Sequence, residues 1–211
     1  ISKPITEDVG GVIEVNAAPG LRMHLYPSKG RSRDVGKAIV DMLYPAGTPH
    51  SIPIISVTGT NGKTTTVRII AHIFKVYGYS VGMTTTGGIY VDDKLIMDGD
   101  TTGPVSAQTL LADKNVDVAI LETARGGIIR SGLGYDLSDI GILTNISADH
   151  LGIDGIYTLD DLLHVKSLVV EAVKDNGYAI LNADDPIVVK ATDSIKSNII
   201  YFSTHENNIV I

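Results

Sequence analysis

The chain has 211 residues, of which 44% are hydrophobic and 19% charged, a composition typical of a globular protein and not of a disordered or fibrous one. It contains no cysteine, which excludes disulfide bonds and thiolate metal sites, and its formal net charge of -7 argues against a nucleic-acid partner. No apolar run approaches the ~20 residues that span a membrane, and no signal-peptide pattern is present, so we expect a cytoplasmic protein without a membrane partner.

The first part of the chain reads as the end of one domain and a linker. It begins without Met, and residues 11–16 are typical of a strand that leads into the turn Pro19-Gly20. Apolar residues at helical spacing predict a helix over 35–44, which Pro45, Gly47 and Pro49 then interrupt. We therefore expect a piece of a longer protein, with one domain ending at residue 48 and another occupying 49–211.

From residue 52 onward, short apolar runs alternate with helical stretches, which is typical of βαβ units. The predicted fold class is therefore α/β, with a mostly parallel sheet and helices on both faces. We predict strands over 52–57, 80–84, 116–121, 140–146, 178–181 and 199–202. A helix is expected over 63–77, ended by Gly78 in a left-handed conformation, and a small hairpin over 89–97 turns at Asp92-Asp93.

A phosphate-binding loop is the strongest local signal, because it lies between a predicted strand and a predicted helix. The predicted nucleotide-binding residues are Gly59, Thr60, Asn61, Gly62, Lys63, Thr64 and Thr65. Lys63 would reach the β- and γ-phosphates, and the Thr64 hydroxyl would bind magnesium. The loop is a variant, because Val57 replaces the first glycine of the general pattern. A glycine-rich turn with a surface lysine is the alternative interpretation.

Several motifs together resemble one known group of enzymes. Residues 59–64 resemble the ATP loop of the Mur ligase superfamily, and residues 84–90, 99–104 and 121–128 are most similar to the cyanophycin synthetases within it. The resemblance covers about residues 11–189. It implies a P-loop-containing central domain of an ATP- and magnesium-dependent ligase, in which a substrate carboxylate is phosphorylated and an amine attacks the acyl phosphate.

The same resemblance implies amino-acid and peptide or polymer substrates, here arginine joined to a poly-aspartate chain, and a possible homo-oligomer of the full-length enzyme. We expect this chain alone not to form amide bonds, because such ligases require a second α/β domain to close over ATP. Two alternatives are another Mur-type ligase, acting on folate, a peptidoglycan precursor or poly-glutamate, and a non-catalytic nucleotide-binding module.

Two candidate metal ligands follow predicted strands. Glu122 ends the strand 116–121, at the edge where open α/β sheets bind ligands, and a carboxylate there can hold magnesium. His150 follows the strand 140–146, and the resemblance assigns it to a second magnesium ion. Taken alone, either residue is more often an ordinary acid at a strand end or an ordinary loop histidine.

Lys166 conflicts with its surroundings in the helix predicted over 159–174. It falls within the apolar stripe, whereas the polar side comprises Asp160, His164, Ser167 and Glu171. A buried lysine is unfavourable unless it is paired or modified. In the Mur ligases a lysine at nearly this position is carbamylated and helps to hold magnesium, which makes Lys166 both a candidate catalytic residue with Lys63 and a metal ligand. A lysine that extends to the surface is the alternative.

Three further sites are open to more than one interpretation. Asn182 and Asp185 lie near the nucleotide or serve as helix-capping and turn residues. Arg125 positions an acidic group or is merely solvated. Residues 14–20 resemble the last strand of an ATP-grasp domain, in which Glu14 and Asn16 would be magnesium ligands separated from the rest of their site.

Overall fold

The structure is a computed structural model that describes residues 15–47, 51–148, 151–206 and 208–210. The chain forms two compact units, residues 1–50 and 51–211. The first contains α1 (Arg22–Leu25) and α2 (Val35–Leu43). The second contains β1 (Ile54–Thr58), α3 (Lys63–Val76), β2 (Val81–Thr85), β3 (Gly88–Val91), β4 (Lys94–Asp98), α4 (Pro104–Leu111), β5 (Val118–Glu122), α5 (Arg125–Ser131), β6 (Ser138–Leu143), α6 (Leu159–Glu171), β7 (Val173–Asn182), α7 (Pro186–Val189), η1 (Lys190–Ser194) and β8 (Asn198–Phe202).

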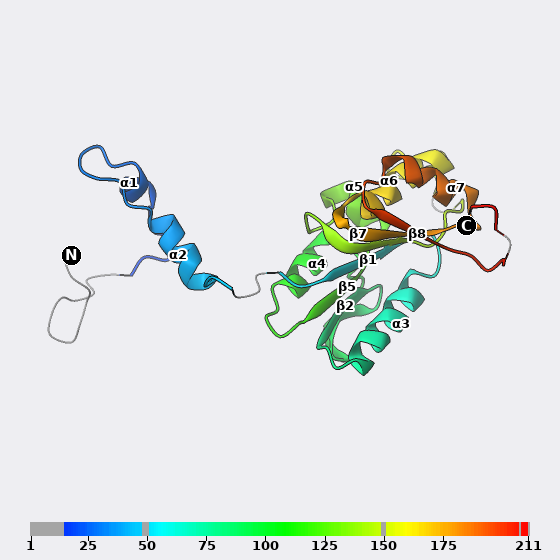
Figure 1. Ribbon diagram of the computed structural model, residues 1–211, viewed down its shortest axis with the longest axis horizontal. Coiled ribbons are helices and arrows are strands. Elements are labelled where there is room, and N and C mark those ends of the chain that lie inside the picture. The colour runs from blue at the N-terminus through cyan, green and yellow to red at the C-terminus, as the bar shows by residue number, and fades with distance from the viewer. Residues whose placement is uncertain (1–14, 48–50, 149–150, 207, 211) are drawn as a thin grey trace. The chain divides into compact units, whose positions relative to one another are not determined.

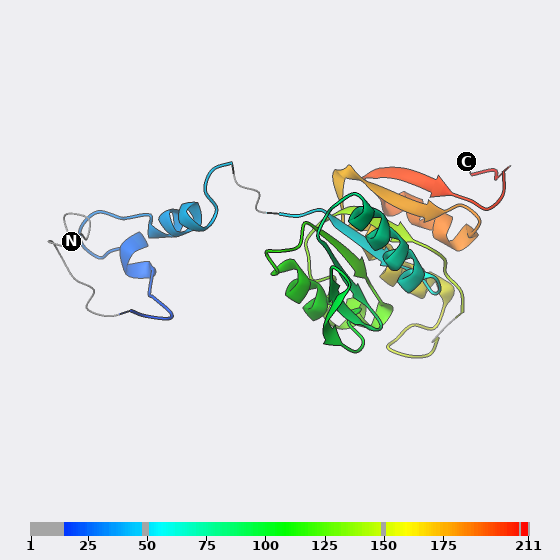
Figure 2. The same cartoon turned by 90° about the horizontal axis from the view of Figure 1, so that it is seen from below.

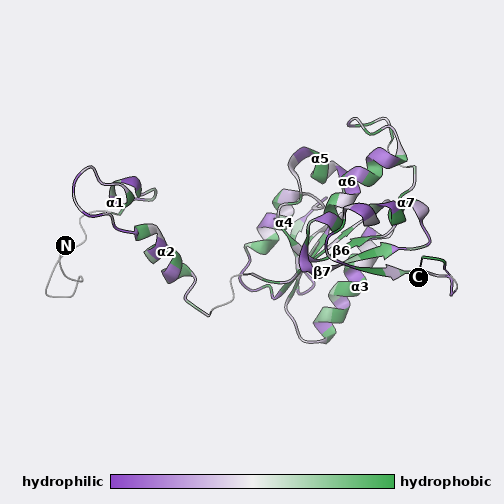
Figure 3. Cartoon of the chain, turned by 45° about the horizontal axis from the view of Figure 1, so that its top comes forward, coloured by the Kyte–Doolittle hydropathy of each residue, from purple (hydrophilic) through white to green (hydrophobic). Residues whose placement is uncertain are grey.

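In the first unit, the expected helix is confirmed as α2. Asp34 caps its start by accepting a hydrogen bond from the Lys37 backbone N–H at 3.0 Å. Hydrophobic and hydrophilic residues alternate around α2 (Figure 3). The strand expected over residues 11–16 falls largely outside the described residues, as does Glu14, whereas Asn16 is exposed. The ATP-grasp assignment of this unit therefore stays a prediction.

The second unit contains one eight-stranded sheet in the order β4-β3-β2-β5-β1-β6-β7-β8. Strands β2, β5, β1, β6, β7 and β8 are parallel to one another, whereas β3 runs antiparallel to β2 and to β4, with which it forms the predicted hairpin. Asp92 and Asp93 make its turn with positive φ angles of 48° and 67°. This mostly parallel sheet confirms the predicted fold class.

Helices cover the two faces of the sheet unequally. α3 packs on one face through Val67 and Ala71, and it ends before Gly78, whose φ of +91° confirms the expected left-handed conformation. α4 and α6 pack against the opposite face, to which α7 also belongs. Figure 1 shows α3 below the sheet and α6 and α7 above it, and Figure 2 shows α3 in front of the sheet. No helix among the described residues is long and apolar enough to cross a membrane.

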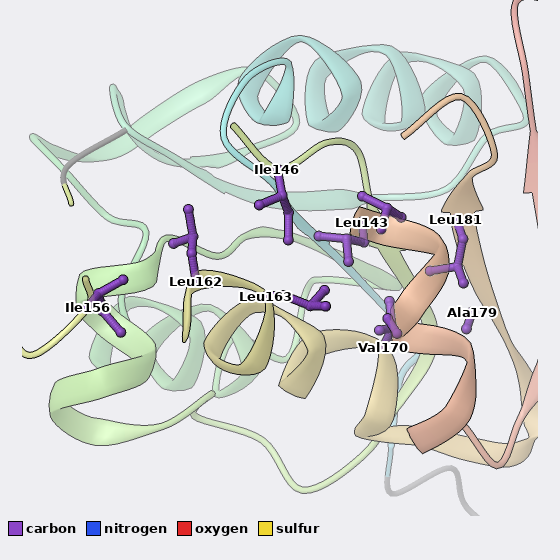
Figure 4. Close-up of a cluster of buried hydrophobic side chains, with 10 residues drawn as sticks. Leu143, Ile146, Ile156, Leu162, Leu163, Val170, Ala179 and Leu181 are labelled. Atoms are coloured by element: carbon purple, nitrogen blue, oxygen red, sulfur yellow. The ribbon is translucent and has the colours of Figure 1, made fainter. Parts of the chain in front are cut away.

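The core cluster under α6 holds the last strands and their helices together. Leu143 and Leu181 from the strands meet Leu163 and Val170 from α6 (Figure 4). At the start of α6, Thr158 caps the helix in a reciprocal capping box with Asp161. Burying such aliphatic side chains stabilises the fold by roughly 1.5–3 kcal/mol each, which fixes α6 against the sheet.

Two details of α6 differ from the sequence prediction. The helix ends at Glu171 instead of residue 174, because Val173 already belongs to β7. Ser167 was expected on the polar side but is buried. Its hydroxyl donates to the Glu171 carboxylate at 2.6 Å and to the His164 carbonyl at 3.0 Å, which satisfies a polar group in the interior.

The two edge strands of the sheet differ in charge and regularity. β4 begins with Lys94 and ends with Asp98, and a bulge interrupts its pairing with β3 near Ile96. β8, with the sequence Asn-Ile-Ile-Tyr-Phe, pairs regularly with β7 and has no charged side chain. Within the described residues, no further strand pairs with the outer side of β8.

The hydroxyl of Tyr135 is buried beside the side chains of Ser56 and Ser138. Burial raises the pKa of Tyr135 from 10.0 to about 12. The neutral hydroxyl therefore contributes stability that is fully present below pH 10 and is lost as the pH rises towards 12. At pH 11 this loss amounts to about 1.4 kcal/mol.

Between pH 9 and pH 11, the unfolding free energy of the wild type should therefore fall by about 1.4 kcal/mol more than that of Tyr135→Phe, which has no hydroxyl to titrate. Denaturant unfolding at a series of pH values measures this difference. Tyr77→Phe, at an exposed position, is the matched control and should follow the wild type. Identical pH dependence in all three chains would contradict the prediction.

Candidate functional site

The predicted phosphate loop connects the end of β1 to the start of α3, as expected. Gly59 and Gly62 have φ angles of +145° and +85°, which other residues rarely adopt. A methyl group on Gly59 would lie 1.9 Å from Thr144 Oγ1, so both the backbone and the available space require glycine there. α3 begins at Lys63, which places the positive end of its dipole directly after the loop.

Hydrogen bonds hold the loop in a curled conformation. Lys63 Nζ donates to the carbonyl oxygens of Gly59 at 3.1 Å and Thr60 at 2.9 Å. The Thr60 N–H donates to the Asn145 carbonyl at 2.8 Å, and the Thr60 hydroxyl accepts from the Ser147 N–H at 3.1 Å. The lysine is thereby folded over its own loop, and the loop is fixed to the segment that follows β6.

A carboxylate and a hydroxyl meet beside the loop. Thr64 Oγ1, in the first turn of α3, donates to Glu122 Oε2 at 2.8 Å. The same carboxylate oxygen accepts from the Thr86 N–H at 3.2 Å, and Glu122 is only 2% exposed at the end of β5. The structure therefore brings together two predicted metal ligands, Thr64 and Glu122. Both are hard oxygen donors of the kind that magnesium prefers.

Lys166 extends from α6 towards the phosphate loop. Its side chain is buried, with 5% of the residue exposed, and its Nζ donates to the Gly59 carbonyl at 2.6 Å. The inward orientation predicted from the helical spacing is thus confirmed. Since Lys63 donates to the same carbonyl, two ammonium groups gather on one oxygen atom.

A cavity of about 390 Å³ opens beside these residues. Its charged lining comprises four cations and one acid: Lys63, Lys166, Arg125, Arg130 and Asp100. The chain as a whole has a net charge of -7, so this concentration of positive charge is local. Such a lining favours anionic groups, and the cavity is the best candidate for a ligand site among the described residues.

Some predicted site residues are less central in the structure. Asn61 and Thr65 are exposed, the former in the loop and the latter in the first turn of α3. His150 lies outside the described residues, so its expected metal role stays a prediction. Within the residues that the structure describes, no three His, Cys, Asp or Glu side chains form a metal-binding group.

The three ambiguous residues take defined positions. Asp185 caps α7 by accepting from the Ile187 N–H at 2.9 Å, and its second oxygen accepts from the Ile146 N–H at 2.7 Å. Asn182 Nδ2 donates to the Thr144 carbonyl at 2.9 Å. These contacts match the capping and turn interpretation.

Arg125, in contrast, is not merely solvated. Its side chain is 14% exposed, forms an ion pair with Asp154 at 3.3 Å and lines the cavity. The other cavity arginine, Arg130, was not identified from the sequence. Arg130 lies five residues beyond Arg125 on the short α5, which rotates it by about 140° around the helix, so helical periodicity gave no signal for its role. Asn145, inside the strand predicted over 140–146, was not identified as a site residue either, although it contacts the phosphate loop.

Comparison with known proteins places these features in a wider group. The Mur ligase middle domain family matches residues 57–211. The chain is 52% identical over its full length to a cyanophycin synthetase from Synechocystis sp. (strain PCC 6803), and it spans 24% of that protein. The chain thus corresponds to about a quarter of the length of such relatives.

Solved structures agree in fold. A UDP-N-acetylmuramoyl-L-alanyl-D-glutamate–2,6-diaminopimelate ligase has a TM-score of 0.63 and 24% identity, covering 82% of this chain and 36% of its own. A MurF ligase from Thermotoga maritima in complex with ADP has a TM-score of 0.55 and 25% identity, covering 74% of this chain and 33% of its own.

Proposed function

Since this chain belongs to the Mur ligase middle domain family, we propose that it is the nucleotide-binding part of an ATP-dependent ligase that forms amide bonds. The observation that carries the proposal is the phosphate loop with Lys63 at its centre, beside a cavity lined by cations. Phosphoryl transfer depends mainly on positioning and on electrostatic stabilisation, which such a lining supplies.

The residues present fit ATP with magnesium. Lys63 would neutralise the β- and γ-phosphates, with the glycine loop and the start of α3 around them. Thr64 and Glu122 would hold the ion, since their oxygens already lie 2.8 Å apart at the end of the loop. When bound, magnesium would reduce the negative charge of the phosphates during transfer. The loop's hydrogen bonds already hold it in the curled conformation in which it would surround this ligand.

Lys166 would be carbamylated in the complete enzyme and would then hold a second magnesium ion with His150. The Lys166 ammonium first loses a proton. The neutral amine nitrogen then attacks the carbon of carbon dioxide, so that an N–C bond forms while one C=O π bond breaks and its electron pair moves to oxygen. Loss of a second proton from the nitrogen completes the change from a cation to an anion. The crowding of Lys63 and Lys166 on the Gly59 carbonyl supports this proposal, because the modification replaces one of two neighbouring positive charges by an oxygen ligand.

The cavity beyond the loop would take the carboxylate substrate. Arg125 and Arg130 line it together with the two lysines, and arginine binds carboxylates in a planar, bidentate manner. An aspartate-rich peptide would place one side-chain carboxylate near the γ-phosphate, and arginine would be the attacking amine. The similarity to cyanophycin synthetase supports this choice of substrates.

Assays of the full-length protein that contains this chain test the function. We expect ADP release to rise severalfold when an aspartate-rich peptide and arginine are both present, because the acyl phosphate forms productively only with its acceptor. Glutamate with a folate, and a peptidoglycan precursor with its amino acid, serve as comparison substrates. Stimulation by one of those pairs instead would indicate another Mur-type ligase. Nucleotide binding without any turnover would indicate a non-catalytic module.

We further propose that residues 1–48 are the end of an ATP-grasp domain, that 49–211 form the central domain, and that the full-length enzyme is a cytoplasmic homo-oligomer. Asn16 and the helix α2 would then belong to the domain that precedes the ligase centre. Limited proteolysis of the full-length protein, followed by mass determination, would reveal whether a boundary lies near residue 48.

A further inference from the structure

Asn145 pairs with one residue of the phosphate loop through both ends of its side-chain amide. Its Oδ1 accepts from the Asn61 N–H at 3.0 Å, and its Nδ2 donates to the Asn61 carbonyl at 2.9 Å. The two contacts fix the orientation of the amide, because a flipped group would face donor with donor and acceptor with acceptor. These two bonds hold the backbone N–H and carbonyl of Asn61 in the same way as pairing with a neighbouring β-strand would.

Adjacent contacts make this pairing part of a continuous support. The Asn145 carbonyl accepts from the Thr60 N–H at 2.8 Å, so Asn145 contacts two successive loop residues, Thr60 through its backbone and Asn61 through its side chain. The Asn61 carbonyl also accepts from Thr144 Oγ1 at 2.8 Å. Asn182 in turn donates to the Thr144 carbonyl at 2.9 Å, which links the support to the end of β7.

The orientation of the Asn61 carbonyl determines the next donor of the loop. A trans peptide is planar, so its N–H points away from the preceding carbonyl oxygen. With the Asn61 carbonyl directed at Asn145, the Gly62 N–H is directed to the opposite side of the loop. Gly62 has a φ of +85°, which a glycine adopts without steric cost, but a glycine can also adopt many other backbone conformations, so neighbouring contacts are needed to restrict it to this one.

We infer that Asn145 is a positioning residue for nucleotide binding: it holds the Asn61–Gly62 peptide so that the Gly62 N–H is presented to the phosphates before the nucleotide arrives. The inference rests on the proposed function, because it takes the loop to bind a nucleotide. Preorganised donors bind an anion without first being ordered, so loss of the clamp lowers affinity even in a folded chain.

Two variants test the clamp with ADP and Mg²⁺ as the probe. Asn145→Ala removes both bonds, whereas Asn145→Leu removes them but keeps nearly the same size and shape and adds no charge. We expect both to weaken ADP binding by about 10-fold, measured by calorimetry. If Asn145 only filled space, Asn145→Leu would bind like the wild type, which would overturn the inference.

Asn198→Ala is the matched control, because Asn198 Nδ2 also donates to a backbone carbonyl, that of Gly177 at 3.1 Å, but at the start of the edge strand β8 and not at the phosphate loop. It should lower the nucleotide-free unfolding midpoint about as much as Asn145→Ala while leaving ADP affinity unchanged. If the wild type binds ADP and Asn145→Ala binds it with an affinity within twofold of the wild type, the positioning role of Asn145 is refuted while the proposed function is not. Failure of the wild type itself to bind ADP would refute the proposed function and the clamp with it.

Discussion

Replacing Lys63 by alanine is expected to weaken the binding of ATP and ADP by about 100-fold, equivalent to about 2.7 kcal/mol. Lys63 Nζ lies within 3.1 Å of two loop carbonyls, so the substitution removes a charged donor from the phosphate position and a brace from the loop at once. Calorimetric titration of each nucleotide in the presence of magnesium measures the loss.

The control for this prediction is Lys75→Ala, which removes the same charge from the other end of α3. Lys75 is exposed and pairs with Asp93, far along the helix from the loop. Its substitution should leave nucleotide affinity unchanged. Equal affinity of the wild type and Lys63→Ala would refute the phosphate-loop assignment, and equal losses in both variants would show that general charge, not position, governs binding.

Replacing Lys166 by alanine in the full-length enzyme is expected to lower ligase activity by about 100- to 1,000-fold. The proposed carbamate would supply an oxygen ligand beside Gly59, which alanine cannot replace. A small carboxylic acid such as acetate fits the space left by the side chain and should partly restore activity. Bicarbonate should not, because the variant has no amine with which carbon dioxide can react.

Lys174→Ala provides the comparison for Lys166, since Lys174 is a partly exposed lysine that pairs with Asp139 at 2.6 Å. That variant should retain activity and should not respond to acetate. Full activity in Lys166→Ala would show that the buried lysine acts only as a loop contact. A loss that acetate does not restore in any degree would favour a structural role over the carbamate.

The sequence was informative wherever local pattern and tertiary environment agree. The apolar run over residues 52–57 predicted β1, because a buried strand requires hydrophobic residues. The glycines and the lysine that follow predicted the phosphate loop and the start of α3, because such a loop requires those residue types. Lys166 was placed correctly because helical periodicity fixes which residues share a face.

Other features depend on contacts between segments distant in the sequence. Ser167 is buried because Glu171 and His164 satisfy its hydroxyl, and a polar residue on a helix gives no local sign of such partners. Asn145 contacts Asn61 across 84 positions, so its place in a predicted strand did not reveal what its side-chain amide holds. The role of Arg130 likewise emerges only from the cavity that several loops enclose.

The contrast between the two edges of the sheet bears on how the isolated chain behaves at high concentration. A bulge and terminal charges protect β4 from pairing with another molecule, whereas β8 offers a regular, uncharged strand of high β-propensity. Aggregation of the 211-residue chain would therefore begin at β8, by addition of a strand from a second molecule. A charged side chain at the exposed Ile200 would act as a gatekeeper and raise the concentration at which the chain remains in solution.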